Sequence, residues 1–75
     1  MRRLQAERQK RRWTRAQEGY AAQVYPALIG QIELGRLSPS PESVVLLRLA
    51  DALGYQGDPA DLLAEVDEDQ SRERR

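Results

Sequence analysis

The side chains that could do chemistry in this 75-residue chain are mostly arginines and carboxylates, because the sequence contains neither cysteine nor histidine. Disulfides, thiolate or histidine zinc sites and histidine-assisted nucleophilic catalysis are therefore excluded. An acid pair such as Asp58 and Asp61 fits helix capping better than catalysis. The chemistry that remains is binding, and we expect no enzyme activity, no cofactor and no metal.

Charge is distributed unevenly along the chain, although the formal net charge is zero. Residues 1–36 contain eight Arg or Lys and three acids, a net charge of +5, whereas residues 37–75 contain four Arg and nine acids, a net charge of −5. This asymmetry is compatible with one surface that faces phosphate and another that faces away. It is equally compatible with solvated helix faces, so charge alone does not decide between the two.

Residues 14–41 contain two helix-length segments that are joined by a short break and followed by a Ser-Pro turn. An α-helix fills the major groove of DNA, and a tight two-helix corner is one way for a small chain to present such a helix. Ile29 and Ile32 lie three residues apart and are expected to face inward, whereas Gly30 and Gln31 lie toward the other side. Double-stranded DNA is therefore the leading candidate partner.

The rest of the pattern predicts an all-α domain, since no alternation of apolar and β-branched residues indicates strands. Thr14 and Gln17 match a capping box that starts the second helix at Arg15. Gly35 ends the third helix, and Ser40 caps a fourth helix whose apolar residues fill the centre of the core. The five helices are expected at about 2–12, 15–22, 26–34, 41–53 and 59–66.

The chain has room for one domain, which is expected to span residues 1–66. Residues 67–75 carry no apolar side chain and are interpreted as a charged, flexible tail or frayed helix. No run of about 20 apolar residues is present, and the basic N-terminus is not followed by an apolar signal-peptide core. We therefore expect a cytoplasmic, nucleoid-associated location and no membrane partner.

The sequence resembles the lambda-repressor-like helix-turn-helix family of phage and bacterial repressors, the Cro or Xre type, over about residues 4–63. The most specific match is Ile-Glu-Leu-Gly-Arg at residues 32–36 with Pro-Ser at 39–40, which is similar to the family signature I-E-x-G followed by P-S. Residues 47–54 resemble the fourth helix of the family. The resemblance implies a compact five-helix bundle of the lambda-repressor type that contains a helix-turn-helix.

The resemblance also implies which residues would touch DNA, with the third helix in the major groove and its N-terminal turn toward base edges. Gln31 is then the groove-facing side chain that can hydrogen-bond a base, and glutamine suits adenine. Arg15 and Arg36 are the expected phosphate contacts, and Tyr25 can donate its hydroxyl to a phosphate. The other expected DNA-binding positions are Pro26, Ala27, Leu28 and Gly30, of which Leu28 could instead pack on the fourth helix.

Arg8 and Glu33 occupy positions that the family pairs in a structural salt bridge between the first and third helices. Three other residues depart from the family pattern. Glu18 stands where a buried apolar residue is usual, so we expect its carboxylate to reach the surface or to pair with an arginine. Gln23 replaces the glycine of the turn, and Tyr25 replaces the Ser or Thr that caps the third helix.

These observations favour a sequence-specific, double-stranded DNA-binding transcriptional regulator, and more narrowly a repressor that occupies promoter DNA. A homodimer is expected, because one recognition helix makes a small interface. Leu62, Leu63 and Val66 are candidate dimer contacts that could equally close the core. The alternative is an antitoxin-like or adaptor protein that binds a protein partner through its acidic second half and binds DNA for autoregulation.

Overall fold

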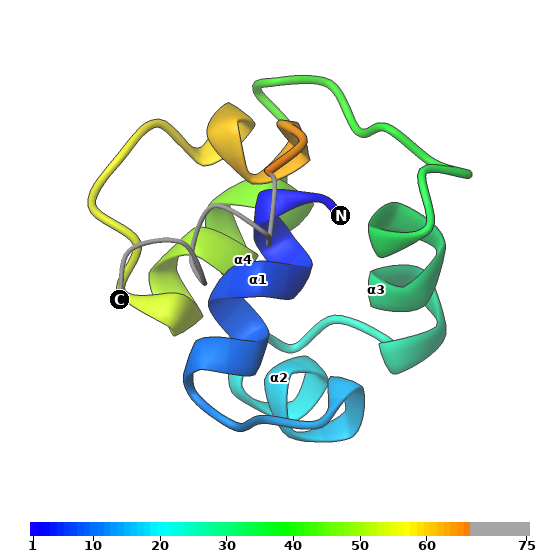
Figure 1. The fold of residues 1–75 in the computed structure, drawn as a ribbon, viewed down its shortest axis with the longest axis vertical. Helices are drawn as coiled ribbons and strands as arrows, with labels where there is room; N and C mark the ends of the chain where they lie inside the picture. Colours follow the sequence, from blue (N-terminus) through cyan, green and yellow to red (C-terminus); the bar gives the residue numbers. More distant parts are fainter. Residues whose placement is uncertain (67–75) are drawn as a thin grey trace.

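The computed structural model describes residues 1–66, which form four α-helices and one short 3-10 helix. The helices are α1 (Arg3–Lys10), α2 (Arg15–Ala22), α3 (Pro26–Glu33), α4 (Val44–Leu53) and the 3-10 helix η1 (Pro59–Leu63) (Figure 1). Extended pairing within these residues is limited to one isolated bridge between Arg2 and Glu65. The all-α prediction is confirmed, but the fifth helix is a single 3-10 helix rather than an α-helix. The tail predicted at 67–75 lies outside the described residues.

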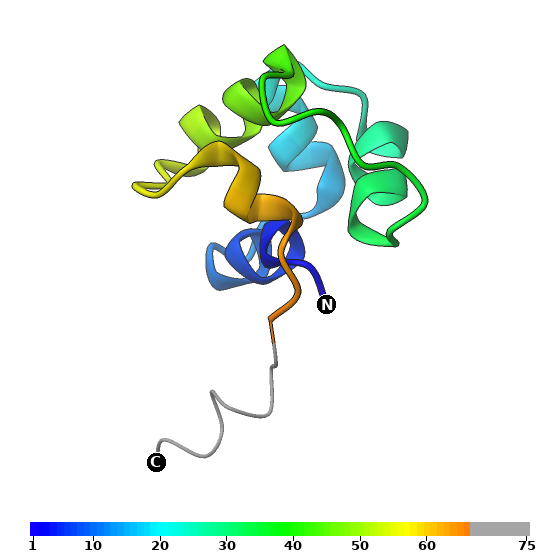
Figure 2. The same cartoon turned by 90° about the horizontal axis from the view of Figure 1, so that it is seen from above.

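Each helix of the described residues contributes to one core, α2 through Ala22. α4 lies behind α1 in Figure 1, α2 lies below both, and α3 stands at one side of the molecule. Figure 2 also shows α3 at the edge. The fully buried apolar side chains are Leu4, Ile29, Ile32, Leu46, Leu49 and Leu62. Each such burial stabilises the fold by roughly 1.5–3 kcal/mol, so α3 is firmly attached by one face while it remains peripheral.

The two ends of the described chain are tied together beside α1. The backbone N–H of Arg3 donates to the carbonyl of Ala64 at 2.8 Å, and that of Val66 donates to the carbonyl of Met1 at 2.7 Å. Leu62 is fully buried, and Leu63 packs against the core. Of the three candidate dimer contacts, these two therefore help to close the core of a single chain.

α4 begins later and buries less than the sequence predicted. The cap is Ser43, whose hydroxyl accepts from the backbone N–H of Val45 at 3.2 Å. Ser40 was the wrong choice because its carbonyl accepts from the N–H of Ser43 at 2.9 Å, so residues 40–43 form a turn in which Pro41 takes the second position. The helix also buries one stripe only, since Val44 and Leu47 are 57% and 51% exposed.

The end of α1 and the start of α2 lie close together in the chain. α1 ends at Lys10, earlier than predicted, and Arg12 adopts a left-handed backbone conformation with φ of 57°.

The predicted capping box of α2 is present. The hydroxyl of Thr14 accepts from the N–H of Gln17 at 3.0 Å, and the side chain of Gln17 accepts from the N–H of Thr14 at 2.8 Å. This reciprocal pair sets where α2 begins and therefore which of its residues face inward.

The corner between α2 and α3 is tight because Gly19 has no side chain. A Cβ on Gly19 would lie 2.5 Å from the carbonyl oxygen of Val24, which is closer than real contacts allow. Gln23 forms the corner in the left-handed region, with φ of 59° and ψ of 47°. Pro26 then occupies the first turn of α3, where its missing N–H is not needed. None of the helices within residues 1–66 is both long and apolar enough to span a membrane.

Candidate nucleic-acid interface

α3 has one buried face and one open face, as its spacing of apolar residues predicts. Ile29 and Ile32 are fully buried. Pro26, Ala27 and Gln31 are exposed on the opposite side. A helix that is anchored along one side and stands at the edge of the fold can be presented to a groove in a partner molecule.

The flanks of this open face are also accessible. Tyr25, immediately before α3, is 82% exposed, and Arg36, just after it, is exposed as well. Leu28 is half-buried, and its side chain packs against the core rather than standing open like those of Pro26 and Ala27. Three of these predicted site residues, Tyr25, Pro26 and Ala27, are therefore gathered at the N-terminal end of α3, and Gln31 follows one turn later.

Gly30 differs from the prediction, because it is buried rather than open. The group that covers it is the side chain of Arg15 from α2. A Cβ added to Gly30 would lie 3.4 Å from Nη1 of Arg15 and 3.5 Å from its Cζ. Gly30 therefore provides a flat place on α3 against which the guanidinium of Arg15 rests, at ordinary contact distance from where a Cβ of residue 30 would lie.

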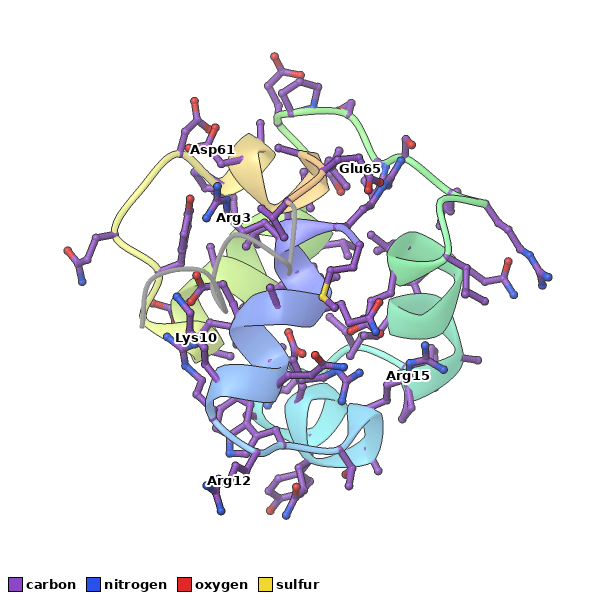
Figure 3. The ribbon with its side chains drawn as sticks, in the orientation of Figure 1. Arg3, Lys10, Arg12, Arg15, Asp61 and Glu65 are labelled. Carbon is purple, nitrogen blue, oxygen red and sulfur yellow. The ribbon has the colours of Figure 1, made fainter. Side chains whose placement is uncertain are left out.

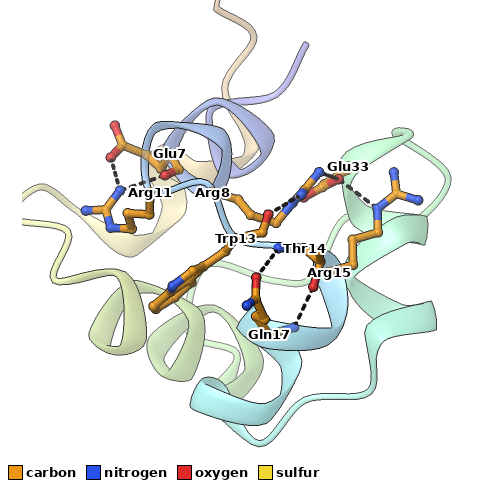
Figure 4. A network of polar contacts seen from close by, with 8 residues as sticks. All are labelled: Glu7, Arg8, Arg11, Trp13, Thr14, Arg15, Gln17 and Glu33. Carbon is orange, nitrogen blue, oxygen red and sulfur yellow. Dashed lines mark hydrogen bonds and ion pairs between the residues drawn. The ribbon is translucent and has the colours of Figure 1, made fainter.

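Arg15 is held in this place by Glu33, which also binds Arg8 (Figure 4). Nε of Arg8 donates to Oε2 of Glu33 at 2.7 Å, and Nη2 of Arg8 donates to Oε1 at 3.1 Å. Nε of Arg15 donates to Oε1 of Glu33 at 3.0 Å. The Arg8–Glu33 pair implied by the resemblance is thus present, and a second arginine joins it from α2.

The carboxylate of Glu33 is fully buried, whereas the side chain of Arg15 is 41% exposed. The Arg8–Glu33 pair is largely buried on both sides, and removing one partner of such a pair typically costs about 3–5 kcal/mol, because the remaining charge is left without compensation. No local sequence pattern signals the Arg15–Glu33 contact, because the two residues are too far apart in the chain for a pairing within one helix. The network connects α1, α2 and α3 at the back of the open face.

Glu18 lies fully buried on α2, and this contradicts the expectation that it reaches the surface or pairs with an arginine. Neither carboxylate oxygen has a hydrogen-bond partner among residues 1–66. Burial and the nearby charge of Glu33 raise the pKa of Glu18 to about 7, although Arg8 and Arg11 oppose the shift. The physical reason for the burial is periodicity: residue 18 lies one turn before buried Ala22, on the face of α2 that packs inward.

The basic side chains at the end of α1 have a different environment from Arg15. In Figure 3, Lys10 and Arg12 lie on the side of the molecule away from α3, whereas Arg15 lies between α2 and α3. Lys10 pairs with Glu7 at 3.2 Å, and Arg11 pairs with the same carboxylate at 3.0 Å. These contacts favour a structural role for Lys10 and Arg11.

Tyr20 is an exposed aromatic residue near the corner that the sequence analysis did not select. It is 90% exposed, and with Tyr25 it borders an open groove of about 500 Å³ between α2 and α3. The groove is also lined by Ala16, Gly19, Gln23, Val24 and Pro26. A signal was available in the sequence, since Tyr20 falls on the face of α2 opposite to Ala22.

The comparison with protein families matches the model described as "Helix-turn-helix domain" to residues 2–63. This range contains all five helices and the corner between α2 and α3. Comparisons with curated proteins and with solved structures gave no significant match. Because the match extends over well more than half of the chain, the protein belongs to the helix-turn-helix domain family.

Proposed function

We propose that this protein is a sequence-specific, double-stranded DNA-binding transcriptional regulator that places α3 in the major groove. The observation that carries the proposal is the two-sided environment of α3. Its isoleucines are buried, while Pro26, Ala27 and Gln31 are open. Membership of the helix-turn-helix family supports the same use of the helix.

The proposed contacts follow from the chemistry of the exposed residues. Gln31 can pair with the N6 and N7 groups of an adenine, and Ala27 and Pro26 can touch a thymine methyl. Tyr25 and Arg36 stand at the two ends of α3 and suit the DNA backbone, where they would set orientation without reading sequence. Arg15 adds a positive charge beside the same face, so attraction to the phosphates contributes to affinity.

We also propose that the regulator represses transcription and acts as a homodimer. Occupying promoter DNA is sufficient for repression and needs no catalytic step. One helix reads only a few base pairs, and two copies on a palindromic site double the interface. Because Leu62 and Leu63 are used in the core, the dimer would form through other residues.

The test is selection from a random pool of DNA duplexes with the full chain, followed by measurement of affinity at several salt concentrations. A DNA-binding regulator of this kind enriches one motif, and its affinity falls steeply as salt rises. A palindromic motif with half-sites about one helical turn apart would support the dimer. No affinity for any duplex at low ionic strength would contradict the proposal, and it would equally remove the DNA-binding part of the antitoxin-like or adaptor alternative.

A further inference from the structure

Gly30 lies at the border of the outer face of α3, where it is covered rather than open. Successive residues of an α-helix turn by about 100°, so Pro26 and Leu34 lie one turn before and one turn after Gly30, and Ala27 lies beside it. A side chain at position 30 would therefore stand among the exposed ones. The guanidinium of Arg15 lies against this position, with Nη1 3.4 Å from the place of a Cβ on Gly30.

The guanidinium of Arg15 is held by a hydrogen bond at Nε, whereas its two terminal nitrogens are free, within the described part of the chain, to bind a partner. Its Nε donates to Oε1 of Glu33, whose carboxylate is fully buried and also held by Arg8. This anchor fixes the inner edge of the guanidinium. Neither Nη1 nor Nη2 donates a hydrogen bond to another residue in the described range 1–66, and the side chain remains 41% exposed. Arg15 thus carries two unused donor groups on the outer face of α3.

Two parallel N–H donors at the end of a planar guanidinium match the O6 and N7 acceptors of guanine in the major groove. A phosphate would also accept hydrogen bonds from these donors. The phosphates, however, border the major groove, whereas a helix that lies in the groove directs its outer face to the base edges at the groove floor. Among the exposed residues of α3 itself, Gln31 alone carries a group that hydrogen-bonds a base edge. Another exposed hydrogen-bonding group beside this face comes from α2, as the guanidinium of Arg15.

We propose that Arg15, laid over Gly30 and anchored by Glu33, reads a guanine next to the base pair that Gln31 contacts. This inference rests on the proposed function, because it requires α3 to lie in the major groove. It changes the expected role of Arg15 from a phosphate contact, which is blind to sequence, to a determinant of sequence preference.

The experiment uses the site selected by the full chain and single-position variants of that site. Binding of the wild-type protein, Arg15→Ala, Arg15→Lys and Arg36→Ala is measured by fluorescence anisotropy on each duplex. We expect one guanine whose replacement by adenine weakens the wild-type protein roughly 5- to 150-fold. Arg15→Ala is expected to bind both duplexes alike, whereas Arg36→Ala keeps the full preference and weakens all duplexes by one factor.

A second probe removes the acceptor and leaves the protein unchanged. Replacing the same guanine by 7-deazaguanine, which lacks N7, should weaken the wild-type protein and leave the affinity of Arg15→Ala unaltered. Arg15→Lys keeps a charge near Glu33, so it tests the role of the planar guanidinium even where Arg15→Ala is too unstable to use. We expect the lysine variant to lose most of the guanine preference.

Three results would overturn the inference. One is a uniform loss of affinity for Arg15→Ala on every duplex, with a salt slope reduced by about one, which is the pattern of a phosphate contact. Another is equal binding of guanine and 7-deazaguanine duplexes by the wild-type protein at every guanine. Either of these leaves the proposed function intact. Failure of the wild-type protein to bind any duplex would overturn both.

Discussion

Glu18 and Glu33 are buried carboxylates on adjacent helices, and of the two only Glu33 has hydrogen-bond partners. Glu33 accepts hydrogen bonds from Arg8 and Arg15, whereas neither oxygen of Glu18 has a partner among residues 1–66. The charge of Glu33 raises the pKa of Glu18 further above its ordinary range. A neutral, protonated Glu18 is therefore the form that the fold prefers.

Stability is expected to fall as pH rises through about 7, because of Glu18. Its pKa is about 7 in the folded protein and near 4.5 in the unfolded chain. Because the folded state binds the proton of Glu18 more tightly than the unfolded chain does, protonation adds to the free energy of unfolding. This added stability is fully present below pH 4.5 and is lost as pH rises through 7. At about 1.4 kcal/mol for each pKa unit, the loss is on the order of 3 kcal/mol from pH 4.5 to 8.5, of which about 2 kcal/mol falls above pH 5.5.

The measurement is urea unfolding at pH 5.5 and 8.5 for the wild-type protein and for Glu18→Gln, which cannot ionise. The variant should lose most of the difference between the two pH values. Asp51→Asn, at an exposed position on α4, is the control and should keep the difference. An equal pH dependence in wild type and Glu18→Gln would show that another group is responsible.

Glu33→Ala is expected to destabilise the fold by about 3–5 kcal/mol, because it leaves the largely buried Arg8 without its carboxylate. Glu65→Ala removes an ion pair whose carboxylate is 75% exposed, so it should change stability by less than about 1 kcal/mol. Free energies of unfolding from urea titrations separate the two. Similar small losses in both variants would mean that the network behind α3 contributes little.

Gly19→Ala is expected to lower the melting temperature, since the new Cβ would meet the carbonyl of Val24 at 2.5 Å. Overpacking of this kind costs about 1–3 kcal/mol, and each kcal/mol corresponds to roughly 4–8 °C in so small a domain. Gly30→Ala is the matched variant, because its Cβ would meet the end of a flexible arginine at 3.4 Å. Calorimetry should show Gly30→Ala near the wild-type value, and a comparable loss in both would contradict the tight corner.

Gln23→Gly is expected to stabilise the protein by about 1 kcal/mol. Gln23 has φ of 59°, a conformation that costs a residue with a side chain about 1–2 kcal/mol and costs glycine little. Ala21→Gly, on the exposed side of α2, is the control and should destabilise by up to about 1 kcal/mol. Melting temperatures that change in the same direction for both variants would argue against backbone strain at Gln23.

Gln31→Ala is expected to relax the choice of one base pair in the selected site. Loss of a bidentate contact removes about 1–3 kcal/mol of discrimination. Affinity for duplexes that already carry the wrong base at that position should change little. Competition binding across the four variants of that base pair measures the effect. An equal loss on all four would contradict the assignment of Gln31 as a base-reading residue.

Much of the fold follows from short patterns in the sequence. The capping box of Thr14 and Gln17 starts α2, Pro26 starts α3, and glycines with positive φ follow the ends of α3 and α4. These signals act between residues a few positions apart, so neighbouring side chains decide them without help from the rest of the chain. The prediction that Ser40 caps α4 was wrong, because residues 40–43 form a turn and the hydroxyl of Ser43 accepts from the N–H of Val45 instead.

The exposed residues around α3 were also predictable, because a helix with isoleucines on one side must leave Ala27 and Gln31 on the other. Two features of the protein are determined only by its tertiary structure. The angle between α2 and α3 lays Arg15 over Gly30 beside Glu33, and the packing of α2 encloses Glu18. Both depend on where separate helices meet, and distances between helices are not encoded in the spacing of residues within one helix.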